Sequence, residues 1–358
     1  MRSNRLAILA HTRPSLRKAM NLAAALPEST LFSPTRYLCE AGPNARAFDG
    51  RLSTWLRIHF YDYDGWICFM AIGGLVRLLA PVIKDKRTDP PVIALDVNAN
   101  FAVCVLSGHR GGGNDLARRV AAILGAQPVI TTGSDGLDTL AADLLGSEFG
   151  WKIEDETHLT RVSAGIVNGE PVGIFQETGE RDWCPADRPL PTNLYPISKI
   201  EEATGDGLSA CLIISDRLYC LERITVPTII YRPLSLVVGV GCRRGVSERM
   251  IAEAVSTTME ESALAFKSIV CLATVERKRD ESGLNDFAAK CGLPVLYYRE
   301  ADLAGVAAPT PSKRVQRLIG VPGVCEQAAL LASGSGDLLV PKRRFPMVTV
   351  AVARKAGY

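Results

Sequence analysis

Short apolar runs alternate with helical patterns along most of this 358-residue chain, and this alternation limits the fold more than any other feature. The run RLAILAHT (5–12) is followed by Pro14 at the start of an amphipathic stretch. GWICFMAI (65–72) is followed by glycine and LVRLLAPVI, and FAVCVLS by the amphipathic NDLARRVAAILG (114–125). Buried strands joined by amphipathic helices are typical of layered α/β domains.

The pattern changes twice, which predicts three parts. Residues 1–140 are expected to form an N-terminal α/β domain. Residues 141–233 hold short apolar runs around Asn168-Gly169, which favours a type I′ hairpin in a smaller middle region. LSLVVGVGC restarts the α/β pattern, so residues 234–358 are expected to form a second such domain. The predicted fold class is α/β, with two layered α/β domains joined by a smaller β-rich middle region.

Composition argues against several classes of function. The formal net charge is +3, and aromatic residues make up 6% of the chain, which does not favour a nucleic-acid-binding surface. The ten cysteines include no CxxC pair, so no zinc or redox site is predicted. WICFMAIGGLVRLLAPVI (66–83) is interrupted by Arg77 and fits a strand, a turn and a helix better than a membrane span. We therefore expect a cytoplasmic protein without a nucleic-acid or membrane partner.

LSGHRGGGND (106–115) places His109 and Arg110 between glycines, directly before a helical pattern. Glycines allow left-handed turns and the close approach of a ligand. A helix capped by Asn114 would present free N–H groups, which attract a carboxylate or phosphate. Histidine is the residue type whose unperturbed pKa lies near neutrality, so His109 is the candidate general base or hydrogen-bond donor. A structural glycine turn with an exposed histidine explains the same residues equally well.

GVGCRRGVSERM (239–250) repeats the arrangement of a buried run, a glycine turn and a capped helix. The guanidinium groups of Arg243 and Arg244 suit carboxylate or phosphate oxygens. The GxGxxxG spacing alone is weak evidence for a dinucleotide site. In PGVCEQAAL, Glu326 lies in the first turn of a helix, where a carboxylate complements the helix dipole.

AIGGLVRLLAPVIKDK (71–86) places Arg77 and Lys84 after a buried run that ends in glycines. Ligands of open α/β sheets usually bind at the carboxyl ends of the strands, and these two cations are expected to line that approach. A helix with a solvated basic face is the alternative explanation for each of them. Together, the three glycine stretches predict edges that bind a ligand with several carboxylates.

Nine short stretches resemble the cobalt-precorrin-5A hydrolase family (CbiG) of cobalamin (vitamin B12) biosynthesis. In the N-terminal part these are FMAIGGLVRLLAP, DKRTDPPVIALD, FAVCVLSGHRGGGNDLA and PVITT. In the C-terminal part, which also resembles the protein CobE, they are VVGVGCRRGVS, DESGL, GLPVLYY, GVPGVCEQAALLA and TVAVAR. They lie in the family's order within residues 65–140 and 235–354, with a poorly marked middle region between.

This resemblance implies a hydrolase of the anaerobic pathway that opens the δ-lactone of cobalt-precorrin-5A, expels acetaldehyde by carbon–carbon cleavage and gives cobalt-precorrin-5B. The substrate is a tetrapyrrole with many carboxylate side chains, and it carries the cobalt, so no cofactor and no protein metal site are expected. His109 is the expected base, with Asp115 close enough in sequence to orient it. The residues expected to contact substrate are Arg77, Lys84, Arg110, Gly111, Gly112, Asn114, Arg243, Arg244 and Glu326.

Two other functions fit the same residues. A non-catalytic corrinoid carrier would hold a tetrapyrrole intermediate with the same glycine and arginine edges, and it differs from the hydrolase by its lack of turnover. A nucleotide-dependent enzyme would instead be stabilised by NAD or ATP, and we expect no such effect. A transient handoff of intermediates to neighbouring enzymes of the pathway is the one protein contact that we consider.

Overall fold

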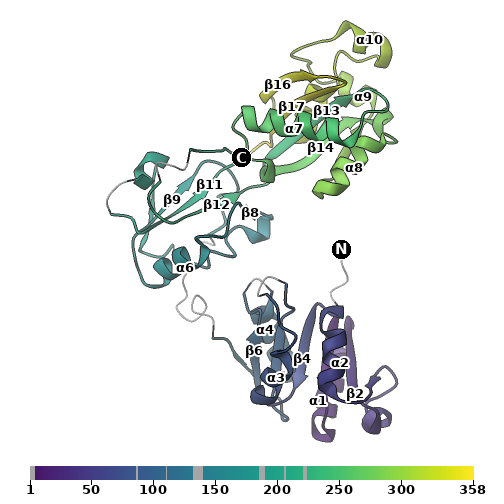
Figure 1. Cartoon of the computed structure of the whole chain (residues 1–358), viewed down its shortest axis with the longest axis vertical. Helices are drawn as coiled ribbons and strands as arrows, with labels where there is room; N and C mark the ends of the chain where they lie inside the picture. The colour runs from purple at the N-terminus through teal and green to yellow at the C-terminus, as the bar shows by residue number, and fades with distance from the viewer. Residues whose placement is uncertain are drawn as a thin grey trace. The chain divides into compact units, whose positions relative to one another are not determined.

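The protein is described here by a computed structural model, which covers residues 5–85, 88–109, 111–131, 140–184, 190–204, 207–220 and 224–358. The chain forms two compact units, Met1–Leu144 and Leu145–Tyr358. The first unit contains one seven-stranded sheet, and the second contains two five-stranded sheets (Figure 1). The α/β fold class is confirmed, with a middle region between two layered domains. The domain limits that we placed at residues 140 and 233 stay a prediction.

The sheet of the first unit has the order β3-β2-β1-β4-β5-β6-β7. Its strands are β1 (Leu6–Ala10), β2 (Ser29–Pro34), β3 (Arg46–Phe48), β4 (Gly65–Phe69), β5 (Val92–Leu95), β6 (Phe101–Leu106) and β7 (Gln127–Val129). Strands β1 to β5 run parallel, because each connection between consecutive strands of this set crosses back over the sheet. The turn between β5 and β6 is short, so β6 runs antiparallel to β5.

Helices cover both faces of this sheet. Residues of α1 (Arg13–Ala25) and α4 (Gly113–Leu124) join Ile8 and Ile67 in one apolar core. Residues of α2 (Leu52–His59) and α3 (Ile72–Leu79) join strand residues of the opposite face in a second core. The two cores explain why the strand sequences are continuously apolar rather than alternating.

The direction of β6 decides which loops of the first unit can meet. Leu106, the last residue of β6, lies opposite Val92, the first residue of β5. The segment after β6 therefore lies at the amino-terminal edge of β1, β4 and β5. The segments after β1 and β4 lie at the carboxyl-terminal edge.

The middle sheet of the second unit has the order β10-β9-β11-β12-β8. Its strands are β8 (Lys152–Ile153), β9 (Val172–Gln176), β10 (Leu194–Pro196), β11 (Ala210–Ile214) and β12 (Thr228–Arg232). The expected hairpin at Asn168-Gly169 is wrong, because the preceding residues form helix α6 (Leu159–Val167) and β9 pairs in parallel with β10 and β11. Gly169 has a φ of 74° just after the helix, which is the usual position of a C-terminal glycine.

The last sheet has the order β15-β14-β13-β17-β16. Its strands are β13 (Leu236–Cys242), β14 (Ile269–Val275), β15 (Val295–Tyr298), β16 (Leu338–Phe345) and β17 (Val348–Arg354). The helices are α7 (Glu248–Glu261), α8 (Ser282–Cys291), α9 (Glu300–Ala304), α10 (Lys313–Ile319) and α11 (Cys325–Ser333). A Cβ on Gly239 would lie 1.8 Å from the carbonyl oxygen of Cys325, so this glycine allows α11 to pack directly on β13.

A buried ion pair joins the two sheets of the second unit. Asp216 follows β11 and is completely buried, and its carboxylate accepts two 2.8 Å hydrogen bonds from the Arg354 guanidinium at the end of β17. The hydroxyl of Ser235 donates to the same carboxylate at 2.7 Å. Because Asp216 is completely buried and Arg354 mostly so, we expect this contact to hold the middle sheet against the last one.

Three findings concern the thiols, the helix lengths and the clusters of metal-binding side chains. All ten cysteines are free thiols. Within the described ranges, no helix combines the length and the apolar character needed to cross a membrane. The described side chains also include no group of three or more His, Cys, Asp or Glu residues arranged to hold a metal ion.

Candidate functional site

The loop between β6 and α4 folds back on itself. The N–H of Gly112 donates to the carbonyl of His109 at 3.0 Å, and the N–H of Asn114 donates to the carbonyl of Gly108 at 2.8 Å. Gly112, with a φ of 76°, is the N-cap of α4 in place of Asn114, which is buried. The expectation that Asn114 caps the helix and that its N–H is free for an anion is therefore wrong.

The glycines of this loop are required by its own packing. A Cβ on Gly111 would lie 2.5 Å from the Cβ of Ser107, and a Cβ on Gly108 would lie 2.6 Å from the side-chain oxygen of Asn114. Both distances are shorter than real contacts allow. A structural role thus accounts for these glycines, and contacts of Gly111, Gly112 and Asn114 with substrate stay predictions.

His109 has a carboxylate neighbour that the sequence did not indicate. Its Nε2 lies 3.7 Å from Oδ1 of Asp143, and the two side chains are 18% and 22% exposed. Asp115, the expected partner, is 87% exposed and pairs with Arg118 at 3.0 Å. The structure therefore brings His109 together with Asp143, a residue 34 positions away in sequence. Arg110 lies outside the described residues.

Asp89, the last residue of the DKRTD stretch, connects the loop after β6 to a second group of polar residues. The hydroxyl of Ser107 donates to the Asp89 carbonyl at 2.7 Å. The buried Asp89 carboxylate accepts hydrogen bonds from the N–H of Lys84 at 3.0 and 3.1 Å and from the hydroxyl of Tyr61 at 2.7 Å. Desolvation and the bond to Asp89 raise the pKa of Tyr61 to about 12. We refer to Tyr61, Lys84, Asp89, His109 and Asp143, with the loop residues 107–109 and 111–113, as the His109 edge.

Arg77 does not lie at the His109 edge. Its guanidinium donates to the carbonyl of Gly73 at 2.7 Å, so it turns back toward the first turn of α3. That turn already contains Gly73 and Gly74, which were expected to precede the helix. Because α3 crosses the sheet from one edge to the other, Lys84 lies at the amino-terminal edge of β4 and β5. The expectation that Arg77 and Lys84 line one carboxyl-terminal approach is therefore wrong.

His11, which directly follows β1, was not among the site residues predicted from the sequence. Burial lowers the pKa of His11, and its Nδ1 is enclosed with no hydrogen-bond partner among the described residues. The neighbours β1 and β4 mark the point where the order of strands reverses, which is a common ligand position in open α/β sheets. The signal was present as a histidine at the end of the first apolar run. It lies at the edge opposite His109.

In the second unit, Arg243 and Arg244 are exposed in the turn between β13 and α7. The ion pairs described for this unit include neither of them, so both guanidinium groups are available to an anion. The turn is held by Glu281 of the DESGL stretch, which is only 8% exposed and accepts a 2.6 Å hydrogen bond from the N–H of Gly245. Ser247 caps α7, as its position predicted.

The contribution of Glu281 to the turn between β13 and α7 can be tested through its pH dependence. Burial alone would raise its pKa, but the ion pair with Lys278 and the N–H of Gly245 lower it below the ordinary value. A carboxyl with a lowered folded-state pKa stabilises the fold above its ordinary pKa and loses that effect as the pH falls. We expect Glu281→Gln to reduce the free energy of unfolding by about 1 to 3 kcal/mol at pH 7. The difference should shrink between pH 5 and pH 3 in urea titrations, and a difference independent of pH would contradict this role.

Glu326 is buried at the start of α11, with 1% of its surface exposed. Its carboxylate accepts hydrogen bonds from the N–H and hydroxyl of Thr310, at 2.9 and 2.8 Å, and from the N–H of Lys342 at 3.0 Å. These bonds tie the segment before α10 to β16. A contact between Glu326 and substrate stays a prediction, and it would require this carboxylate to give up main-chain partners.

The chain matches three family descriptions that together span most of its length. "Cobalamin synthesis G N-terminal" matches residues 54–135, "Cobalamin biosynthesis central region" matches residues 140–233, and "Cobalamin synthesis G C-terminus" matches residues 236–353. The His109 loop lies within the first match, and the Arg243–Arg244 turn within the third.

Similar proteins carry related names. A protein of Priestia megaterium named cobalt-precorrin-5A hydrolase is 37% identical over 97% of this chain and 94% of its own length. A protein of the same name from Salmonella typhimurium is 31% identical over 93% of each chain. The solved structure of CobE, from the cobalamin (vitamin B12) biosynthetic pathway, is 32% identical, covers 34% of this chain and 90% of its own, and has a TM-score of 0.31.

Proposed function

This chain belongs to the cobalt-precorrin-5A hydrolase family, and from that premise we propose that the His109 edge carries the acid–base chemistry of its reaction. The chain is a hydrolase of cobalamin biosynthesis that acts on cobalt-precorrin-5A. The observation that carries this function is the 37% identity to a cobalt-precorrin-5A hydrolase along nearly the whole of both chains. The comparisons do not favour a non-catalytic carrier.

The proposed reaction begins with attack of water on the lactone carbonyl. His109 takes a proton from the water, the ring C–O bond breaks, and a carboxylate and an alcohol are formed. His109 then releases its proton to solvent and takes the proton of the alcohol. A carbon–carbon bond breaks, which releases acetaldehyde and leaves the electron pair in the conjugated macrocycle. A base that is partly shielded from solvent and held next to a carboxylate suits both proton transfers.

Asp143 orients His109 in this proposal. The two groups are 3.7 Å apart, close enough for the carboxylate to stabilise an imidazolium that forms when water is deprotonated. Oxyanion stabilisation by the main chain is limited, since the N–H groups of Gly112 and Asn114 already bond within the loop. Lys84, tied to the same loop through Asp89, supplies positive charge at this edge.

The exposed Asp115 provides a matched control for Asp143. We expect Asp143→Asn to lower kcat for acetaldehyde release by about 10- to 100-fold, the usual cost of a misplaced catalytic group. Asp115→Asn should leave kcat near that of the wild type, because its carboxylate pairs with Arg118 on the surface of α4. Steady-state kinetics on both variants test this assignment, with thermal unfolding as a check on folding. A loss in Asp115→Asn without a loss in Asp143→Asn would restore Asp115 as the orienting residue.

The proposal also covers the substrate, the cofactor, the location and the partners of the protein. The substrate is a tetrapyrrole that brings the cobalt with it, so the chain needs no cofactor of its own. Its carboxylate side chains are contacted by basic residues at the sheet edges, among them Lys84, Arg243 and Arg244. We place the protein in the cytoplasm, where its free thiols remain reduced. It has no nucleic-acid or membrane partner in this proposal, beyond transient handoff to neighbouring enzymes of the pathway.

A further inference from the structure

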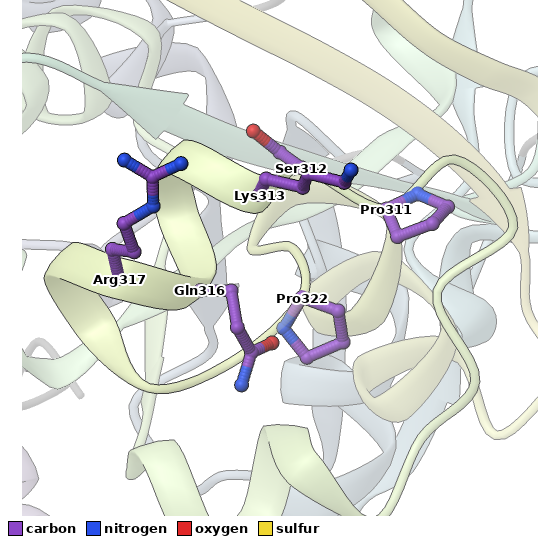
Figure 2. Close-up of a pocket in the computed structure, with 6 residues that line it drawn as sticks. All are labelled: Pro311, Ser312, Lys313, Gln316, Arg317 and Pro322. Carbon is purple, nitrogen blue, oxygen red and sulfur yellow. The ribbon is translucent and has the colours of Figure 1, made fainter.

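A pocket beside α10 has no part in the function described so far (Figure 2). It has a volume of about 350 Å³. Its lining consists of two proline rings, a hydroxyl, a carboxamide and two cations, contributed by Pro311, Ser312, Lys313, Gln316, Arg317 and Pro322. The proline rings give rigid apolar walls, and the two cations make the pocket attractive to an anion.

The segment that forms the pocket is closed by a main-chain hydrogen bond, and the residues after it lead to the carboxyl-terminal end of β13. The N–H of Ser312 donates to the carbonyl of Pro322 at 2.7 Å, which closes the two ends of the segment. Val324, two residues later, lies 3.8 Å from the Cβ position of Gly241 on β13. Since β13 ends one residue after Gly241 and leads into Arg243, the chain that leaves the pocket at Pro322 reaches the carboxyl-terminal end of this strand within two residues.

Both cations of the pocket lack a carboxylate partner among the ion pairs of the described residues. Lys313 and Arg317 are exposed and lie four positions apart on α10, where side chains are neighbours and like charges repel. Other arginines of the same unit are paired with carboxylates, namely Arg277, Arg299 and Arg343.

We propose that this pocket binds a carboxylate side chain of the tetrapyrrole substrate, with Lys313 and Arg317 pairing with the carboxylate and the rings of Pro311 and Pro322 packing on its methylene groups. The volume is near the lower end of the range of about 300–1,000 Å³ for small-molecule sites, so it fits a side chain rather than the macrocycle. The inference rests on the proposed function, because that function supplies a substrate with such side chains.

The test is the double variant Lys313→Gln/Arg317→Gln, compared with Arg249→Gln/Lys290→Gln, which removes two exposed charges from α7 and α8 of the same unit. For cobalt-precorrin-5A we expect the pocket variant to raise KM about tenfold. Its kcat should change by less than about twofold, because the bound carboxylate is not one of the reacting groups and its contact is made equally in the ground and transition states. Added salt should raise the KM of the wild type more than that of the pocket variant.

An unchanged KM in the pocket variant, or an equal rise in the control, would overturn the proposal. If the wild type releases no acetaldehyde, the proposed function is wrong, and this result does not decide whether the pocket binds a carboxylate. Equilibrium dialysis of cobalt-precorrin-5A, followed by its visible absorbance, then decides the pocket separately. About tenfold weaker binding by the pocket variant supports the subsite, and equal binding overturns it.

Discussion

Replacing His109 with alanine is expected to lower kcat for acetaldehyde release by about 10²- to 10⁴-fold, the usual contribution of a positioned general base. The imidazole is 18% exposed and next to Asp143, so alanine removes the proton acceptor without opening the core of the first unit. Binding of cobalt-precorrin-5A should be retained, because the basic residues assigned to its carboxylates are unchanged. Steady-state kinetics of aldehyde release, together with equilibrium dialysis, separate the two effects.

His59→Ala is the matched control for this experiment. His59 lies at the end of α2 in the same unit, where its ring pairs with Asp62 at 2.8 Å on the surface. We expect its kcat to equal that of the wild type. Turnover of His109→Ala at the wild-type rate would show that His109 is not the base. His11, at the opposite edge of the sheet, would then become the next candidate.

The second large effect concerns the joint between the two sheets of the second unit. We expect Asp216→Ala to reduce the free energy of unfolding by about 3 to 5 kcal/mol, because it leaves the mostly buried Arg354 without its partner. The same change removes the acceptor of Ser235. Urea unfolding followed by circular dichroism measures the loss, and hydrogen exchange should show reduced protection in β12 and β17.

Glu253→Ala is the control for Asp216→Ala. Glu253 pairs with Arg249 on the surface of α7, where both side chains are well exposed. Exposed pairs of this kind contribute little to stability, so we expect almost no change in the unfolding transition. An equally small effect of Asp216→Ala would show that the buried pair does not hold the two sheets together.

Many strands and helices of the two α/β domains could be predicted because they carry their own local signals, whereas β2 and β3 were not predicted. Pro14 lies in the first turn of α1, and Ser247 accepts a hydrogen bond at the start of α7. The secondary structure of the middle region was harder to predict from the sequence. Asn168-Gly169 resembles a hairpin turn when read alone, but the preceding residues bury Leu159, Val162 and Ile166 at helical spacing. The pair is therefore the end of a helix.

The candidate site could be predicted only in part, because its partners come together through the topology. His109 was identified from its glycine surroundings. Asp143 lies 34 positions further along the sequence, and no local pattern joins the two residues. Likewise, the antiparallel direction of β6 decides that Lys84, and not Arg77, lies at the edge of His109. Spacing along the chain does not reveal such a reversal.

The most direct test of the central claim is the amount of acetaldehyde trapped when the purified protein is incubated with an excess of cobalt-precorrin-5A. Our account predicts many equivalents of acetaldehyde per protein chain and the appearance of cobalt-precorrin-5B. Tight binding of the substrate without release of aldehyde would contradict it, and would instead identify the chain as a carrier of the intermediate.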